Sequence, residues 1–174
     1  MLIKRNKIFE GRIIKLYEDI IKIKNKNLTR ELVVHPGSVV IIPVLNEKTK
    51  DIVLIKQFRY AVNKNIFELP AGTLEKNENP LICAKRELQE ETGYKAKFFK
   101  KITEIFPSPG IMTEKMHLFI AKNLMKSKQN FDDDEKIKTI IINLDKVVKM
   151  IIEGKINDAK TIAGILLFWV MTQK

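Results

Sequence analysis

Residues 72–94 read GTLEKNENPLICAKRELQEETGY and concentrate glutamates within little more than twenty positions. Four of them lie at spacings that a single helix and the loop before it would bring together: Glu78, Glu87, Glu90 and Glu91. Like charges three or four residues apart on a helix repel one another. Arg86 lies four residues before Glu90 and can brace it, but one arginine cannot neutralise three carboxylates. We therefore expect a cation among them.

The same stretch carries the signals of one helix over residues 80–92. Asn79 can cap its first turn, Pro80 fits that turn, and Gly93 can end the helix. At 100° per residue the apolar side chains of this helix fall on one stripe, and the three glutamates fall on the arc beside it. One face is therefore expected to pack and the other to present carboxylate oxygens. The alternative is a solvated acidic face without a ligand.

Oxygen ligands of this kind are those that hard divalent cations prefer. Mg²⁺ binds through a few carboxylates and leaves its other positions to water and substrate phosphates. The glutamates thus predict an incomplete magnesium site that a phosphate would complete.

The spacing from Gly72 to Tyr94 resembles the Nudix box, GX5EX7REUXEEXGU, where U is a bulky apolar residue. Tyr94 is the one departure, because an aliphatic residue is usual there. The resemblance implies a loop-helix-loop that binds Mg²⁺ or Mn²⁺ and hydrolyses a nucleoside diphosphate joined to a further group. It places the metal on Glu87 and Glu91, often with Glu90, and on the backbone carbonyl of Ala71.

The resemblance also makes Arg86 the residue that orients these carboxylates and Glu78 a supporting carboxylate. We expect Glu91→Gln to abolish turnover and to leave the fold intact, because an exposed carboxylate contributes little to stability without metal.

Stretches outside the box resemble the ADP-ribose pyrophosphatase branch of the family: 29–44, 55–75, 107–121, 131–137 and 157–167. They imply cleavage of ADP-ribose to AMP and ribose 5-phosphate by a homodimer whose N-terminal strands, within residues 1–35, cross to the partner. Alternatives are hydrolysis of GDP-mannose, FAD or a dinucleoside polyphosphate. An alternative of another class is a nucleotide-binding or RNA-binding protein that kept the fold without catalysis.

Substrate residues follow from the same resemblance. Arg59 in QFR would hold the diphosphate with its planar fork, and Arg30 in TRE would reach the adenosine half, in the neighbouring subunit. A surface arginine and a surface ion pair are the plainer interpretations. Glu135 and Asp133, in the acidic stretch 131–135, are candidates for the general base, and a solvated loop is the alternative. Glu114 is expected to contact substrate or metal.

Length and pattern predict one domain over residues 1–174 of mixed α/β (α+β) class. Apolar, β-branched runs predict an antiparallel meander of four strands at 11–25, 28–35, 38–45 and 51–59, whose first members form an N-terminal strand extension. Further strands are predicted at 95–106, 115–121 and 136–144. Helices are predicted at 145–154 and 157–173. A mixed sheet sandwiched between helices accommodates all of them.

The chain of 174 residues carries a net charge of +11, which suits an anionic partner or a solvated surface. Its lysines are scattered without interleaved aromatic residues, so nucleic-acid binding is not favoured. Cys83 is the only cysteine, so no disulfide forms within the chain, and a reducing cytoplasm is the expected setting. No targeting segment is apparent, and the apolar run 162–171 is too short to span a bilayer.

Overall fold

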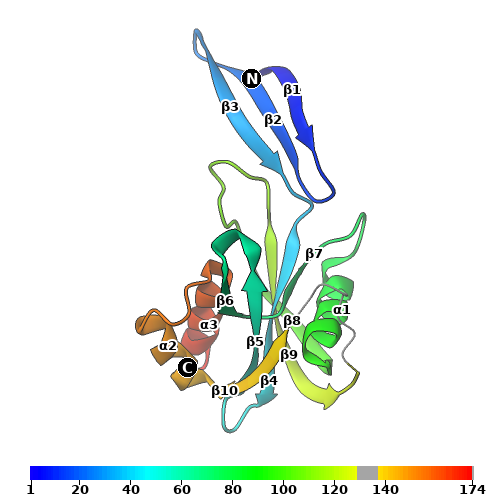
Figure 1. Cartoon of the computed structure of the whole chain (residues 1–174), viewed down its shortest axis with the longest axis vertical. Coiled ribbons are helices and arrows are strands. Elements are labelled where there is room, and N and C mark those ends of the chain that lie inside the picture. Colours follow the sequence, from blue (N-terminus) through cyan, green and yellow to red (C-terminus); the bar gives the residue numbers. More distant parts are fainter. Residues whose placement is uncertain (129–136, 174) are drawn as a thin grey trace.

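The computed structural model describes residues 1–128 and 137–173 of the chain. Within these ranges two sheets and three α-helices form (Figure 1). The elements are, in chain order, β1 Leu2–Glu10, β2 Lys15–Ile23, β3 Lys26–Val34, β4 Ser38–Asn46, β5 Asp51–Arg59, the 3-10 turn Tyr60–Val62, β6 Lys64–Glu68, β7 Ala71–Thr73, α1 Pro80–Thr92, β8 Tyr94–Ile105, β9 Met116–Lys126, β10 Lys138–Asn143, α2 Leu144–Ile152 and α3 Ala159–Met171.

The larger sheet has the strand order β10-β5-β4-β9-β8, with β6 beside β5 and β7 beside β4. Strands β4 and β9 run parallel, whereas the other pairs of this sheet are antiparallel. The sheet is therefore mixed, as its sequence predicts.

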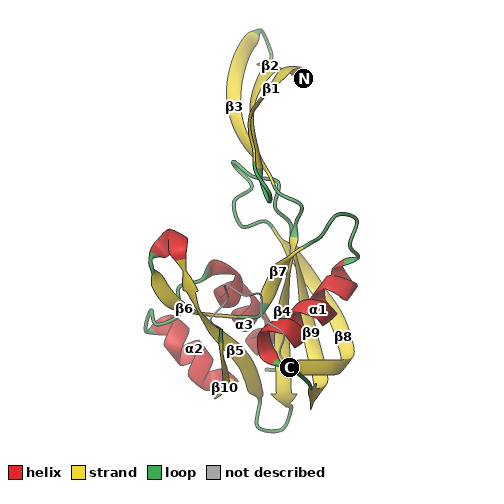
Figure 2. Ribbon diagram, turned by 45° about the vertical axis from the view of Figure 1, so that its right-hand side comes forward, coloured by secondary structure: helices red, strands yellow, loops and turns green. Residues whose placement is uncertain are grey.

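Strand β4 occupies the middle of the sheet and is buried on both faces, which explains its uninterrupted apolar run. Val39 and Ile41 belong to the core cluster that contains residues of α1. Val40 and Ile42 belong to the cluster that contains residues of α2 and α3. Successive side chains of a strand point to opposite faces, so helices cover both sides of the sheet (Figure 2). The predicted fold class is confirmed.

Helix α1 begins and ends where the sequence predicts. The Asn79 side chain accepts a hydrogen bond from the Leu81 N–H at 2.8 Å. Gly93 ends the helix with φ 72°, in the left-handed region, and its N–H donates to the Gln89 carbonyl at 2.9 Å. Helix α3 lies within its predicted range and is capped by Asp158. Helix α2 is capped by Asn143 and begins at Leu144, one residue before its predicted range and at a position predicted to end the preceding strand.

The prediction of one four-stranded meander is wrong. Strand β2 pairs with β3 on one side and, on the other, with β1, which was not predicted, and these three form a separate antiparallel sheet. Strand β3 does not continue into the larger sheet, because Pro36 and Gly37, the latter with φ 102°, redirect the chain before β4. The small sheet projects from the rest of the molecule (Figures 1 and 2). Strands β6 and β7 were also missed.

Among the described residues, no helix is both long and apolar enough to cross a membrane.

Candidate active site

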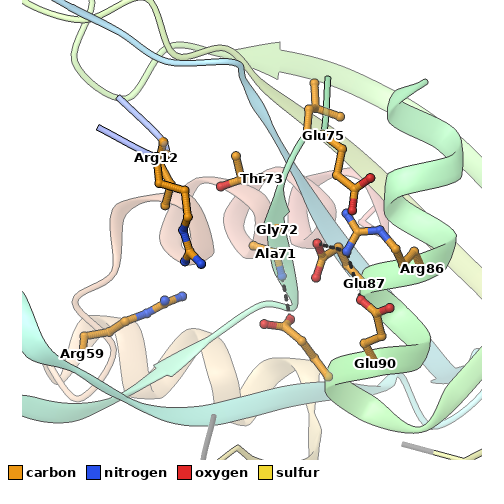
Figure 3. A pocket seen from close by; sticks show the side chains of 12 residues that line it. Arg12, Arg59, Ala71, Gly72, Thr73, Glu75, Arg86, Glu87 and Glu90 are labelled. Carbon is orange, nitrogen blue, oxygen red and sulfur yellow. Dashed lines mark hydrogen bonds and ion pairs between the residues drawn. The ribbon is translucent and has the colours of Figure 1, made fainter. Parts of the chain in front are cut away.

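A cavity of about 570 Å³ opens between α1, β7, the end of β5 and the turn that joins β1 to β2 (Figure 3). Its walls differ in charge. One wall carries carboxylates from α1 and from the segment after β7, and the other carries the guanidinium groups of Arg12 and Arg59. Residues far apart in the chain thus build one site with acidic and basic sides.

Arg86 holds the acidic wall together. Its Nη1 donates to Glu87 Oε1 at 2.6 Å and to Glu90 Oε2 at 2.9 Å. Its Nε and Nη2 donate to the two carboxylate oxygens of Glu78, each at 3.2 Å. One guanidinium therefore braces three of the four glutamates in the quoted stretch, as the sequence predicts for Glu90.

This bracing shifts the pKa values of both partners. Burial alone would raise the pKa of Glu78, but hydrogen bonds from Arg86 and from the Glu75 N–H outweigh burial, so the pKa lies below its ordinary value. Burial would lower the pKa of Arg86, but Glu78, Glu87 and Glu90 raise it overall. The Glu78 carboxylate and the Arg86 guanidinium are therefore kept charged.

Glu91 is held by the strand opposite α1. Its Oε2 accepts a hydrogen bond from the Ala71 N–H at 2.9 Å, and the residue is 4% exposed. The expectation that Glu91 is exposed is wrong, because β7 packs over the last turns of α1. That packing depends on Gly72, where a Cβ would lie 1.9 Å from Glu87 Cδ.

On the basic wall, Arg59 is anchored to a buried carboxylate. Its Nε donates to Glu68 Oε1 at 2.6 Å and its Nη2 to Glu68 Oε2 at 2.8 Å. Glu68 is fully buried on β6 and also accepts a hydrogen bond from Lys160 Nζ. The hydrogen bond to Glu68 raises the pKa of Arg59. Burial would raise the pKa of Glu68, but Arg59 and Lys160 outweigh it and lower the pKa.

The structure brings most of the predicted site residues to this cavity: Arg59, Ala71, Arg86, Glu87, Glu90 and Glu91. Glu114 does not line it, and instead accepts a hydrogen bond from Ser38 Oγ at 2.8 Å. Arg30 lies on β3, is exposed, and donates to the Thr29 carbonyl at 3.0 Å. Glu135 and Asp133 lie outside the described residues.

Several residues of the site were missed by the sequence analysis. Arg12 and Glu75 line the cavity, and Glu68 and Lys160 form the support behind Arg59. Glu68 gave a usable signal, because a charged residue inside the apolar stretch IFELP is expected to need a buried partner. Arg12 gave none, since it lies in a turn far from the box in sequence.

The donor chemistry of the acidic wall fits a hard divalent cation. Glu87, Glu90 and Glu91 offer carboxylate oxygens from adjoining positions on α1, and neither nitrogen nor sulfur ligands line that wall. Among the described residues, no three acidic, histidine or cysteine side chains already converge at metal-binding distance. In this arrangement the Arg86 guanidinium occupies the space between Glu87 and Glu90.

A cavity with carboxylates on one wall and arginines on the other is suited to a divalent cation together with an anionic ligand. Comparison with known proteins gives the family: residues 34–164 match the NUDIX domain. The chain belongs to the Nudix family, whose members in general need a divalent metal.

Similar proteins cover most of the chain. An ADP-ribose pyrophosphatase of Bacillus subtilis (strain 168) is 40% identical over 162 residues, covering 91% of this chain and 86% of that protein. A methanol dehydrogenase activator of Bacillus methanolicus is 40% identical over 166 residues, covering 94% and 89%. A GDP-mannose pyrophosphatase of Escherichia coli O139:H28 (strain E24377A / ETEC) is 37% identical over 145 residues, covering 78% and 74%.

A solved structure has the same fold. The crystal structure of an ADP compounds hydrolase superposes with a TM-score of 0.87 at 17% identity, covering 99% of this chain and 95% of that one.

Proposed function

We propose that the protein hydrolyses the diphosphate bond of a nucleoside diphosphate sugar, and that its substrate is ADP-ribose, cleaved by water to AMP and ribose 5-phosphate. The observation that carries the proposal is the cavity in which three glutamates of α1 face Arg12 and Arg59. The choice of ADP-ribose is supported by the 40% identity to an ADP-ribose pyrophosphatase over 91% of the chain.

The acidic wall would hold Mg²⁺, or Mn²⁺, through Glu87, Glu90 and Glu91 together with the Ala71 carbonyl. When bound, the metal supplies a polarised water and stabilises charge on the departing phosphate. Arg86 holds Glu87 and Glu90 in place through its hydrogen bonds. Arg59 donates to the diphosphate from the guanidinium edge that Glu68 does not use.

Glu135 or Asp133 takes the proton from the attacking water, and Glu114 contacts substrate or metal.

Hydrolysis of ADP-ribose tests the proposal directly. Purified protein with Mg²⁺ is expected to release AMP and ribose 5-phosphate in equal amounts, and the same protein treated with EDTA is expected to release neither. Glu91→Gln serves as the inactive variant. GDP-mannose, FAD and a dinucleoside polyphosphate are assayed in parallel.

The outcomes separate the candidate functions. If the protein hydrolyses GDP-mannose and does not hydrolyse ADP-ribose, the proposed substrate is replaced and the proposed reaction class is kept. An absence of any hydrolysis, together with a salt-sensitive RNA affinity that Glu91→Gln leaves unchanged, would replace catalysis by RNA binding.

We also propose that the protein is a homodimer formed through β1, β2 and β3, and that Arg30 acts at the partner's site. Asp19 is the only buried residue of this sheet, while Leu2, Ile3, Ile8 and Phe9 are about half exposed. A three-stranded sheet without a packed apolar face is marginal in water, which supports a covering partner. Light scattering is expected to give twice the mass of 20.2 kDa, and a monomeric mass would refute the dimer.

The buried, unpaired Cys83 is compatible with the cytoplasm as the setting.

A further inference from the structure

A fully buried carboxylate lies behind the basic wall. Glu68 is 0% exposed and is followed by Leu69, which belongs to the main apolar core. Removing a carboxylate from water is strongly unfavourable unless charged or polar partners replace the water. The structure therefore has to supply partners to Glu68, and the identity of those partners indicates what the residue does.

Two cations meet this carboxylate, one nine residues before it in the chain and one 92 residues after it. Arg59 donates from Nε at 2.6 Å and from Nη2 at 2.8 Å, in a bidentate pair. Lys160, at the start of α3, donates from Nζ. Lys160 is shared with Asp158 at 3.0 Å. The four side chains carry two positive and two negative charges, so the group is neutral as a whole.

The group is tied to the backbone of the core. Asp158 caps α3 by accepting hydrogen bonds from the Thr161 N–H at 3.1 Å and from Thr161 Oγ1 at 2.6 Å. Thr161 Oγ1 in turn accepts from the Leu69 N–H at 2.7 Å. Glu68 is thus held by its place on β6 and by Lys160 on α3, and Asp158 and Thr161 tie the start of α3 to the core.

Arg59 is different, because its side chain leaves the core. It is 40% exposed and lines the cavity across from the glutamates of α1. Both hydrogen bonds to Glu68 use the edge formed by Nε and Nη2, so the edge formed by the two Nη groups is the one available to a ligand in the cavity. A long arginine side chain loses rotamer freedom when it is fixed, and Glu68 fixes it before substrate arrives.

We propose that Glu68 is a positioning residue: it holds the Arg59 guanidinium in the orientation that binds the diphosphate, and it lowers the entropic cost of binding. The proposal rests on the function proposed above and goes beyond it in assigning this role to a residue that does not reach the cavity. The competing explanation is that Glu68 only stabilises the fold.

A double-mutant cycle separates the two explanations. If Glu68 acts through Arg59, Glu68→Gln raises the KM for ADP-ribose about 10-fold and changes kcat by less than about 3-fold, since a ground-state contact is weakened. In an Arg59→Ala background the same substitution then adds nothing to the KM of Arg59→Ala alone. Independent effects of the two substitutions on KM would overturn the proposal.

Thr161→Val provides the matched control. Thr161 is fully buried in the same network but makes no contact with Arg59. The isosteric change is expected to lower the melting temperature, as Glu68→Gln does, and to leave KM unchanged. A rise in KM for Thr161→Val as large as that for Glu68→Gln would show that general loosening of the fold is sufficient, and would refute a specific role for Glu68.

A measurement on the wild-type protein makes the test independent of variant folding and of turnover. The chain has only five arginines, so their Nε–H signals can be resolved by NMR and that of Arg59 assigned with Arg59→Lys. We expect slow exchange of the Arg59 Nε–H with water both before and after addition of inorganic pyrophosphate, because Glu68 holds it in both states. Rapid exchange in the free protein would overturn the proposal even if ADP-ribose is hydrolysed. Slow exchange without any hydrolysis of nucleoside diphosphates would refute the proposed function and leave the anchoring of Arg59 in place.

Discussion

Gly72→Ala probes how closely strand β7 and helix α1 fit together. The added Cβ would lie 1.9 Å from both Cδ and Oε1 of Glu87, whereas ordinary contact begins at 3.4 Å. The Glu87 carboxyl group would therefore have to retreat by about 1.5 Å, and it cannot do so without weakening its 2.6 Å hydrogen bond from Arg86. A displacement of about 1 Å in an active site can cost about 100-fold in rate. We expect kcat/KM for the nucleotide sugar to fall by about 100-fold.

Stability is expected to change less than activity in this variant. Gly72 does not have a positive φ, so alanine adds no backbone strain, and the loss is close to one hydrogen bond between partly exposed charged groups, about 1.5 kcal/mol. Steady-state release of AMP and urea unfolding measure the two quantities. Gly110→Ala is the matched control, since a Cβ there meets nothing within 4 Å, and it is expected to be neutral in both assays. Wild-type kcat/KM in Gly72→Ala would refute the inferred contact and with it the role of Glu87.

Three further changes test other parts of the site. Glu91→Gln is expected to lower kcat by at least about 100-fold, whereas the amide oxygen can still accept the Ala71 N–H, so urea unfolding should shift by about 1 kcal/mol or less. Arg12→Ala is expected to raise KM about 10-fold with little effect on kcat, measured with the same substrate, and an unchanged KM would exclude Arg12 from binding. The folded-state pKa of Glu68 lies below 4.5, so its charged form stabilises the fold above that pH, and this contribution is lost as the pH falls. Wild-type protein should therefore lose stability below about pH 4.5 more steeply than Glu68→Gln, and equal slopes in urea titrations would contradict the cause given for the shift.

The sequence analysis succeeded where the determining residues are close together. Asn79, Pro80 and Gly93 act on the helix that they bound, and the bracing of Glu90 by Arg86 follows from a spacing of four residues. It failed on Glu91, which carries the same charge as its neighbours but is buried. Helical periodicity gives the face on which a residue lies, and it does not give the strand that covers that face.

The prediction of a four-stranded meander in the N-terminal region failed for a related reason. Strands β2, β3 and β4 all contain apolar, β-branched residues, which predict strands without indicating which strands pair. The turn at Pro36 and Gly37 separates the two sheets, and β4 pairs instead with β5, β7 and β9.

The sequence by itself determined helix α1, its caps and the carboxylates along it, because these depend on backbone interactions within a few residues. Only the tertiary structure decided what faces those carboxylates. Arg12 and Arg59 come from separate elements, and Glu68 meets Lys160 across 92 positions of the chain. Glu68 pairs with Arg59 and Lys160 because the fold removes its carboxylate from water and leaves these two cations as its partners. A pattern read along the chain does not contain that information.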